Sequence, residues 1–307
     1  PLAQRNGLWS RLAGDHYSEP FNLLLHGGDQ LYADEMPAPF LSILIEASIP
    51  TGRDYNAGGA RYNTSYLQGV GIASMADSLA ALKMHVFEDK GLTMDALLNA
   101  LASDFEGYPS LRSRLLHQTP KYGNDDDYAD DLMQKAFEAY LGAVDGRPNV
   151  KGGHYRINML PTTCHVYFGS VVGALPDGRK AHLPLPEGIS PSKGADRQGP
   201  TAVIKSASKM DHLRTGGTLL NQKFSPRVLA ADQGLDNLVH LIRAYFELDG
   251  HHIQFNVVDA ATLREAQKHP EKYRNLIVRV AGYSDYFNDL GETLQNEIIR
   301  RTEHEGV

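Results

Sequence analysis

The sequence is poor in cysteine and has neither a strongly basic segment nor a long apolar run. Its 307 residues include one cysteine, Cys164, which excludes an intrachain disulfide framework and a metal site of clustered cysteines. Asp and Glu number 37 against 30 Lys and Arg, so neither nucleic acid nor an anionic membrane surface is an expected partner. No segment is typical of a membrane span or a signal peptide. Since a chain without disulfides suits a reducing compartment, we expect a cytoplasmic protein.

Helical and strand-like patterns alternate along the chain, which indicates an α/β fold. Apolar spacing predicts helices, supported by possible N-caps at Thr93 and Asp259 and by a stop at Gly250. The expected helices cover residues 40–45 (buried), 70–86, 94–101, 132–140, 235–246, 260–268 and 290–298. Strands are expected at residues 162–168, 253–257 and 275–280. Residues 184–200, rich in Pro, Gly and Ser, indicate an ordered loop and the expected domain boundary.

The most informative stretch lies near the C-terminus, where the strand 275–280 ends in Ala281, Gly282 and Tyr283. A glycine at such a turn usually marks a backbone conformation that other residues avoid. Here it belongs to a longer pattern, which resembles the radical loop of the glycyl radical enzymes. The resemblance rests on the following segments: Arg279-Val280-Ala281-Gly282-Tyr283-Ser284, residues 252–258, Pro270-Glu271-Lys272-Tyr273, Gly58-Gly59-Ala60-Arg61-Tyr62-Asn63, Leu175-Pro176-Asp177-Gly178-Arg179 and residues 191–202.

The resemblance implies a role for the glycine itself. In that family the glycine at the position of Gly282 loses an α-hydrogen and stores an unpaired electron on its Cα. Arg279, Ala281, Tyr283 and Ser284 would be its neighbours in the loop. A planar radical centre suits glycine because glycine has no Cβ to crowd it. Apolar residues on the preceding strand would keep water and oxygen away from the radical.

The resemblance also implies a fold and a domain division. The family's fold is a ten-stranded α/β barrel, and this chain would be its C-terminal part. The chain opens on Pro1, without an initiator methionine, which also indicates a piece of a longer protein. Residues 1–180 would belong to the pyruvate formate-lyase-like barrel domain, truncated at its N-terminus, and residues 181–307 would form the glycine radical domain. The full-length enzyme is expected to be a homodimer.

A second residue that the family needs is missing from this sequence. Family members pass the radical to a cysteine in a Gly-Cys-x-Glu or Cys-Cys loop, whose thiyl radical takes hydrogen from the substrate. That loop normally lies further upstream of the glycine than this chain is long. Cys164 sits in a predicted strand, and we expect it to be a buried, inert thiol, with a catalytic Cys164 as the alternative. We therefore expect the chain alone to be inactive.

Residues 162–168 are candidates for the substrate pocket, because the strand before the 175–179 loop contributes to the cavity in the family. Thr162 is the first candidate, and Thr163 and His165 rank after it. Strand alternation places Thr162 and Cys164 on one face, and Thr163 and His165 on the other. Ordinary packing of a barrel strand is an equally weighted alternative for each residue.

Residues 254–259 and 266–273 favour one branch of the family. They look like the glycerol, propanediol and hydroxyproline dehydratases and choline trimethylamine-lyase. The resemblance implies an anaerobic lyase that eliminates water or another leaving group from a small polar substrate. A separate activase, which uses S-adenosylmethionine and an iron–sulfur cluster, would install the radical, so we expect no bound cofactor or metal. Two alternatives stay open: formate C-acetyltransferase activity, as in pyruvate formate-lyase, and a non-catalytic spare-part carrier of the radical.

Overall fold

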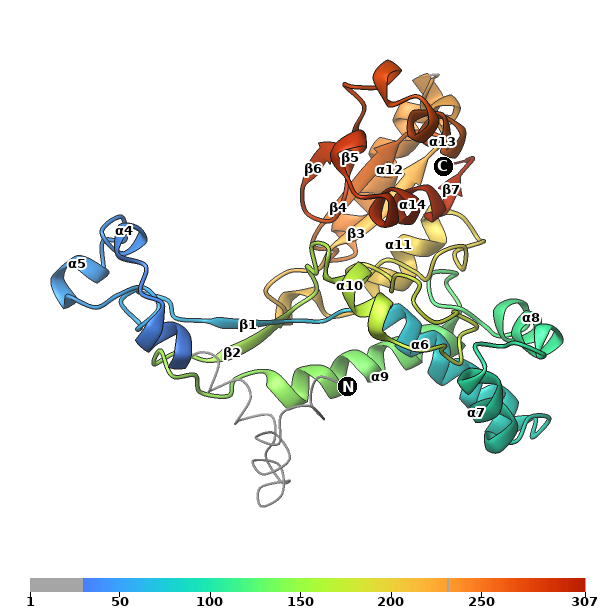
Figure 1. The fold of residues 1–307 in the computed structure, drawn as a ribbon, viewed down its shortest axis with the longest axis horizontal. Helices are drawn as coiled ribbons and strands as arrows, with labels where there is room; N and C mark the ends of the chain where they lie inside the picture. Colours follow the sequence, from blue (N-terminus) through green and yellow to red (C-terminus); the bar gives the residue numbers. More distant parts are fainter. Residues whose placement is uncertain (1–29, 231, 307) are drawn as a thin grey trace. The chain divides into compact units, whose positions relative to one another are not determined.

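The computed structural model describes residues 30–230 and 232–306 (Figure 1). The chain divides into two compact units. The first comprises Pro1–Leu67 and Val144–Arg156, and the second comprises Gln68–Ala143 and Ile157–Val307. Strands β1 (Ser65–Gln68) and β2 (Tyr155–Asn158) form a two-stranded sheet. No helix within the described residues is long and apolar enough to cross a membrane.

The described part of the first unit includes the short helices α4 (Pro39–Ser42) and α5 (Ser48–Thr51). The buried helix expected at residues 40–45 is wrong, because α4 is a single turn and its Phe40 is 76% exposed. Side chains compete with the helix for backbone groups there. The hydroxyl of Ser42 donates to a carboxylate oxygen of Asp54 at 2.7 Å, and the same carboxylate accepts the N–H of Ala38 at 2.9 Å. An apolar run thus did not suffice to specify a long helix.

The second unit begins with a series of helices, all of which the sequence pattern anticipated except the one at residues 109–117. They are α6 (Ile72–Ala81), which runs into a π-helical segment Leu82–Glu88, α7 (Met94–Ala102), α8 (Pro109–His117) and α9 (Asp127–Val144). The N-cap at Thr93 is confirmed, since its hydroxyl accepts the N–H of Ala96 at 3.2 Å. One buried apolar cluster joins this region: Ala81, Leu92, Leu97, Ala100, Phe105 and Leu115.

The strand predicted at residues 162–168 is wrong, because this segment forms the helix α10 (Cys164–Val171). Packing explains the difference. His165 and Gly169 lie four residues apart on the buried face of α10, and a Cβ added at Gly169 would collide with the carbonyl of Leu183. Arg179 also donates to the carbonyl of Gly169 at 2.7 Å. Tertiary contacts that need a helical period have overridden the local preference of Thr, Val, Tyr and Phe for strands.

The side chains of this segment differ in their exposure. Thr162 and Cys164 are exposed, Thr163 is half-buried and His165 is buried. These exposures agree with the pairing expected of a strand, but the strand on which that expectation was based is absent, because the segment from Cys164 onward is helical. The expectation of a buried Cys164 is also wrong within the described residues, since Cys164 is the first residue of α10 and its side chain is exposed.

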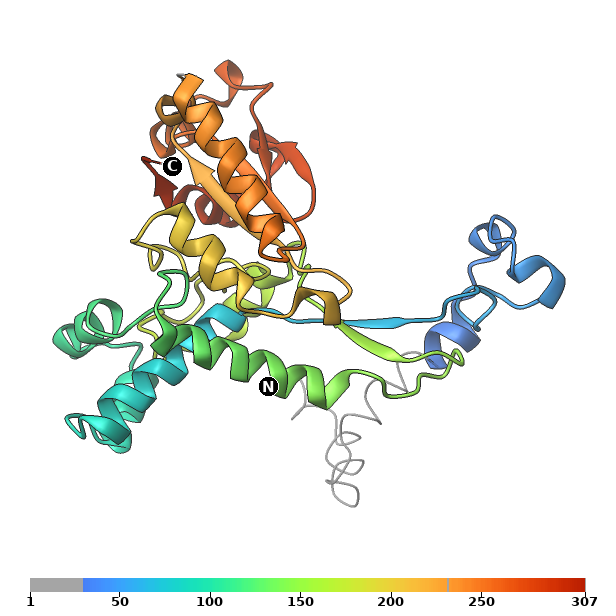
Figure 2. The ribbon, with the colours of Figure 1, turned by 180° about the vertical axis from the view of Figure 1, so that it is seen from behind.

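A parallel sheet forms the C-terminal part of the second unit. β3 (Leu220–Phe224) lies between β4 (Ile253–Val257) and β7 (Glu303–His304), and both neighbours run parallel to it. The chain crosses from β3 to β4 through the helix α12 (Asp232–Glu247), seen from behind in Figure 2. Helix α11 (Pro200–Ser208) precedes β3, and residues 184–199 before it contain no helix or strand, as expected.

Strand β4 has an unexpected buried face. The alternation places Ile253, Phe255 and Val257 together, as predicted, but the opposite face is the buried one. Its side chains, Gln254 and Asn256, are 5% and 4% exposed. Buried amides require hydrogen-bond partners, so this face of β4 must meet another polar surface.

That surface is a short hairpin followed by the last helix. β5 (Ile277–Arg279) pairs antiparallel with β6 (Ser284–Tyr286), and a 3₁₀ turn then leads to α14 (Glu292–Arg300). The second strand of this hairpin, between the predicted strand at residues 275–280 and the predicted helix at 290–298, was not expected from the sequence. The predicted N-cap at Asp259 is confirmed: its carboxylate accepts the N–H of Thr262 at 2.6 Å at the start of α13 (Ala260–Lys268).

Candidate functional site

Gly282 lies at the tip of the β5–β6 hairpin. The register pairs Arg279 with Ser284, and the N–H of Val280 donates to the carbonyl of Tyr283 at 2.9 Å. Gly282 has φ of +85°, in the left-handed region that strongly favours glycine. A Cβ added there would meet only the Cδ1 atom of Leu219, at an ordinary 3.6 Å. The backbone conformation, rather than crowding, is therefore what demands glycine at this position.

A buried apolar cluster includes residues at the base of the hairpin. Val278 and Val280 point into it and are almost fully buried, whereas Gly282 itself is exposed in this chain. The expected shielding of the tip by the preceding strand is therefore wrong within the described residues. The valine side chains fix the base of the hairpin instead. The cluster also contains Val258, Leu263, Ala266, Phe287, Leu290, Ile298 and Ile299.

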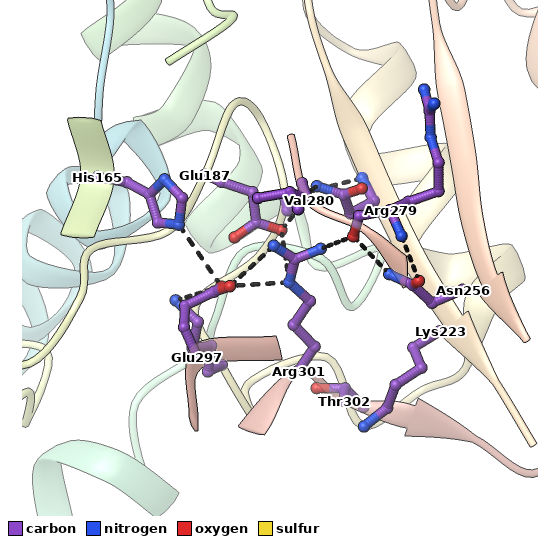
Figure 3. A network of polar contacts seen from close by, with 12 residues as sticks. His165, Glu187, Lys223, Asn256, Arg279, Val280, Glu297, Arg301 and Thr302 are labelled. Carbon is purple, nitrogen blue, oxygen red and sulfur yellow. Dashed lines mark hydrogen bonds and ion pairs between the residues drawn. The ribbon is translucent and has the colours of Figure 1, made fainter. Parts of the chain in front are cut away.

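The backbone of the strand that leads to Gly282 is held by side chains from three other elements (Figure 3). Asn256 on β4 accepts the N–H of Arg279 at 2.8 Å and donates to its carbonyl at 2.9 Å. Arg301, just after α14, donates to the same carbonyl at 3.2 Å. Asn221 on β3 reaches the carbonyl of Val280 at 3.4 Å. These contacts explain the buried polar face of β4.

The side chain of Arg279 extends the same network. Its guanidinium donates to the amide oxygen of Gln254 at 2.9 and 3.2 Å, and to the hydroxyl of Ser284 across the hairpin at 3.0 Å. Gln254 in turn donates to Asn221. Two of the predicted loop neighbours, Arg279 and Ser284, are thus in direct contact.

The other two predicted neighbours of Gly282 differ in their surroundings. Ala281 is buried, and Tyr283 is half-buried. Burial, assisted by the charge of Asp285, raises the pKa of the Tyr283 phenol, which keeps it protonated.

A group of buried charges lies beside the hairpin. Glu297 on α14 is fully buried and receives a two-pronged contact from Arg301, with oxygen–nitrogen distances of 2.8 and 3.2 Å. Lys193 approaches the same carboxylate at 3.0 Å. Burial disfavours the charged form of Glu297, but the positive charges of Arg301 and Lys193 outweigh burial and hold the pKa of Glu297 well below its usual value.

His165, Glu187 and Glu297 could in principle ligate a metal ion. Their ligand atoms lie within 4.8 Å of one another, and all three residues are buried. Arg301, however, is bound to Glu297 and lies 3.8 Å from Glu187, and Lys193 also pairs with Glu297. Because two cations already neutralise the two carboxylates, a divalent ion would introduce excess positive charge. The donor set fits an ion-pair network better than a metal centre.

The residues predicted for the substrate pocket do not share one environment. Thr162 has φ of +49° and its hydroxyl donates to the carbonyl of Pro161 at 2.8 Å. Thr163 precedes the first residue of α10. His165 points inward, and its Nε2 lies 3.7 Å from Glu297 (Figure 3). The structure thus brings His165, but not the exposed Thr162, into the charged group beside the hairpin.

Sequence reasoning missed the residues that hold the hairpin in place: Asn221, Asn256, Glu297 and Arg301. One signal was available for Asn256, because it alternates with Gln254 on a strand whose other face is apolar. No comparable signal marks Arg301, which looks like an ordinary basic residue beyond a helix C-terminus.

Two parts of the chain each match the sequence model of a known protein family. Residues 25–169 match the sequence model of the family described as pyruvate formate lyase-like, and residues 185–288 match the one described as glycine radical. Gly282 falls within the second match. The trans-4-hydroxy-L-proline dehydratase of Clostridioides difficile is 58% identical over 275 residues, which are 90% of this chain and 35% of that protein.

Solved structures agree with these matches. The glycerol-bound form of the B12-independent glycerol dehydratase from Clostridium butyricum has a TM-score of 0.86 and 46% identity, and the match covers 90% of this chain and 35% of that one. A glycyl radical enzyme from Archaeoglobus fulgidus has a TM-score of 0.86 and 41% identity, with coverage of 92% and 37%. The chain therefore spans about a third of the length of these relatives. The predicted fold class is confirmed, since the chain covers a fragment of their α/β barrel.

Proposed function

Because this chain belongs to the glycyl radical enzyme family, we propose that Gly282 is the radical site of an anaerobic lyase or dehydratase. The protein of which the chain is the C-terminal part would eliminate water or another leaving group from a small polar substrate. One observation carries this proposal: Gly282 stands in a left-handed conformation at the tip of an anchored hairpin, inside the segment that matches the glycine radical domain.

The geometry of the tip suits a stored backbone radical. Removal of one α-hydrogen atom from Gly282 leaves one electron on Cα, and the centre must then flatten. The nearest atom that a Cβ there would meet is Cδ1 of Leu219, at 3.6 Å, so nothing crowds this change. The exposed tip is also accessible to a group that abstracts hydrogen. The base of the hairpin, by contrast, is fixed by Asn256, Arg301 and the apolar cluster.

The proposed reaction proceeds by successive hydrogen-atom transfers. An activase that uses S-adenosylmethionine and an iron–sulfur cluster takes the hydrogen atom from Gly282. The glycine radical then takes hydrogen from a cysteine thiol, and the thiyl radical takes hydrogen from the substrate. The substrate radical loses its leaving group, and the product radical recovers hydrogen from the thiol. The thiyl cysteine is proposed to lie outside residues 1–307, and no bound cofactor is proposed for this chain.

The division of labour within the chain follows from the same proposal. Residues 1–180 would contribute to the barrel domain and residues 181–307 would form the glycine radical domain, in an enzyme that is a cytoplasmic homodimer. The separate matches to residues 25–169 and 185–288 support this division. They also disfavour a spare-part radical carrier, since such a carrier needs little beyond the radical loop.

Thr162, Thr163 and His165 stay candidates for contact with the substrate. Thr162 and Thr163 lie just before α10, at its N-terminus, where the helix dipole favours polar or anionic groups. His165 is buried, so it would act on the pocket only from behind, through its neighbours.

Oxygen-dependent cleavage tests the assignment of Gly282. The complete protein should be activated anaerobically, exposed to oxygen and examined by mass spectrometry. We expect scission at Gly282 and release of a peptide that begins near Tyr283. Gly282→Ala should abolish scission, and the cost to the fold should stay near 1 kcal/mol, because the added Cβ has room and only the left-handed backbone is strained.

Gly291→Ala is the matched control. Gly291 has φ of −62°, and nothing lies within 4 Å of an added Cβ, so alanine fits there without strain. This variant should be cleaved like the unchanged protein. Cleavage that persists in Gly282→Ala, or that maps to another glycine, would overturn the assignment.

A further inference from the structure

We propose that Arg301 and Glu297 act together as positioning residues for the radical loop. They form a clamp, defined here as the Arg301–Glu297 pair, which holds the carbonyl of Arg279, three positions before Gly282. The proposal rests on the radical role of Gly282. It adds to that role a device that determines where the radical stands relative to α10 and the 184–199 loop.

The guanidinium of Arg301 makes the central contact. It is almost fully buried, and it directs Nε and Nη2 to the carboxylate of Glu297 while Nη1 donates to the carbonyl of Arg279 at 3.2 Å (Figure 3). A planar guanidinium held by two parallel bonds has a fixed orientation. The direction of Nη1, and therefore the position of the Arg279 carbonyl, follows from the position of Glu297.

Glu297 is in turn fixed by groups that precede the hairpin by about a hundred residues. Lys193 contacts its carboxylate at 3.0 Å from the 184–199 loop, and His165 on α10 lies 3.7 Å from it. Glu187, in the same loop, lies 3.8 Å from Arg301 and accepts a hydrogen bond from Asn221 at 3.1 Å. The clamp thus connects α10 and the 184–199 loop to the strand of the radical loop.

The position of Gly282 depends on this connection because Gly282 itself has few contacts. Gly282 is exposed, and Leu219 is the one neighbour that an added Cβ would meet within 4 Å. Its location is therefore transmitted from the base, where Asn256 and Arg301 share the carbonyl of Arg279. Lysine at position 301 would keep the charge that neutralises Glu297. It would lose the planar set of N–H donors that contacts both Glu297 and the carbonyl of Arg279.

Amide hydrogen exchange of the complete, unactivated protein tests the clamp. Arg301→Lys and Glu297→Gln should each accelerate exchange of residues 279–283 about tenfold, which corresponds to about 1.4 kcal/mol of local opening. The amides of β3 and β4 should keep their exchange rates. Arg214→Lys is the control, since it alters an exposed Arg–Glu pair of 2.7 Å with Glu138. It should change nothing in residues 279–283.

The radical provides a second readout. After activation, Arg301→Lys should lose radical signal faster than the unchanged protein, while Arg214→Lys should not. Equal exchange and equal radical lifetime in the clamp variants would overturn the proposal, and so would acceleration spread evenly over the sheet, which marks general destabilisation. If the unchanged protein formed no radical at Gly282, the proposed function would fail, and the exchange data alone would still decide whether the clamp exists.

Discussion

Replacement of Asn256 by leucine should weaken the attachment of the radical loop by an amount that can be worked from its contacts. The side chain is 4% exposed and makes two hydrogen bonds, at 2.8 and 2.9 Å, with the N–H and carbonyl of Arg279. Leucine shares the branched shape of asparagine, but it is larger and forms no hydrogen bonds, so overpacking adds to the cost. The N–H of Arg279 loses the one side chain that accepts it, whereas the carbonyl keeps Arg301. A buried unsatisfied group costs about 1–3 kcal/mol, and we expect about 2–4 kcal/mol in total.

Urea unfolding of the complete protein, followed by circular dichroism, measures this cost. At a slope near 3 kcal/mol per molar urea, the midpoint of the transition that includes this unit should fall by about 1 M. Asn99→Ala, on the exposed face of α7, is the control and should stay within about 0.5 kcal/mol. A shift for Asn256→Leu no larger than that of the control would refute the view that the side chain anchors the hairpin.

Three further predictions follow from other parts of the chain. Burial raises the pKa of Asp77 from 3.8 to about 7, so the folded state keeps a proton that the unfolded state releases. The free energy of unfolding should therefore fall by at most about 4 kcal/mol as pH rises from about 4 to 7. Asp77→Asn should flatten this decline in urea titrations repeated across that pH range. Thr162→Val in the complete enzyme should change substrate affinity or turnover at unaltered radical yield, and unchanged kinetics would remove Thr162 from the site. Residues 1–307 expressed alone with an activase should show no turnover of diol, choline or hydroxyproline and should self-associate. Turnover that is measurable in this fragment and disappears in Cys164→Ser would contradict the prediction and make Cys164 the hydrogen-abstracting residue.

The sequence was sufficient where local chemistry decides the structure. Thr93 and Asp259 cap their helices as predicted, because an N-cap depends on the few residues that follow it. The turn at Gly282 was predictable for the same reason, since a left-handed residue at a hairpin tip favours glycine. Its role came from a longer resemblance and not from the turn.

The sequence failed where distant contacts decide. Residues 164–171 have strand-like composition but form α10, because Gly169 must pass close to the carbonyl of Leu183. The clamp joins Arg301 to Glu297 four positions earlier and, through it, to His165 and Lys193 more than a hundred positions earlier. No periodicity records such a contact. The roles of Glu297 and Arg301 beside the hairpin therefore emerged only from the fold.

Electron paramagnetic resonance of protein labelled with glycine that carries ¹³C at Cα tests the central claim most directly. The complete protein should be activated anaerobically with its activase, unlabelled and labelled, alongside Gly282→Ala and Gly291→Ala. We predict a doublet that gains ¹³C splitting on labelling, persists in Gly291→Ala and is absent from Gly282→Ala. A doublet that survives in Gly282→Ala, or one that labelling leaves unchanged, would contradict the assignment of the radical to Gly282.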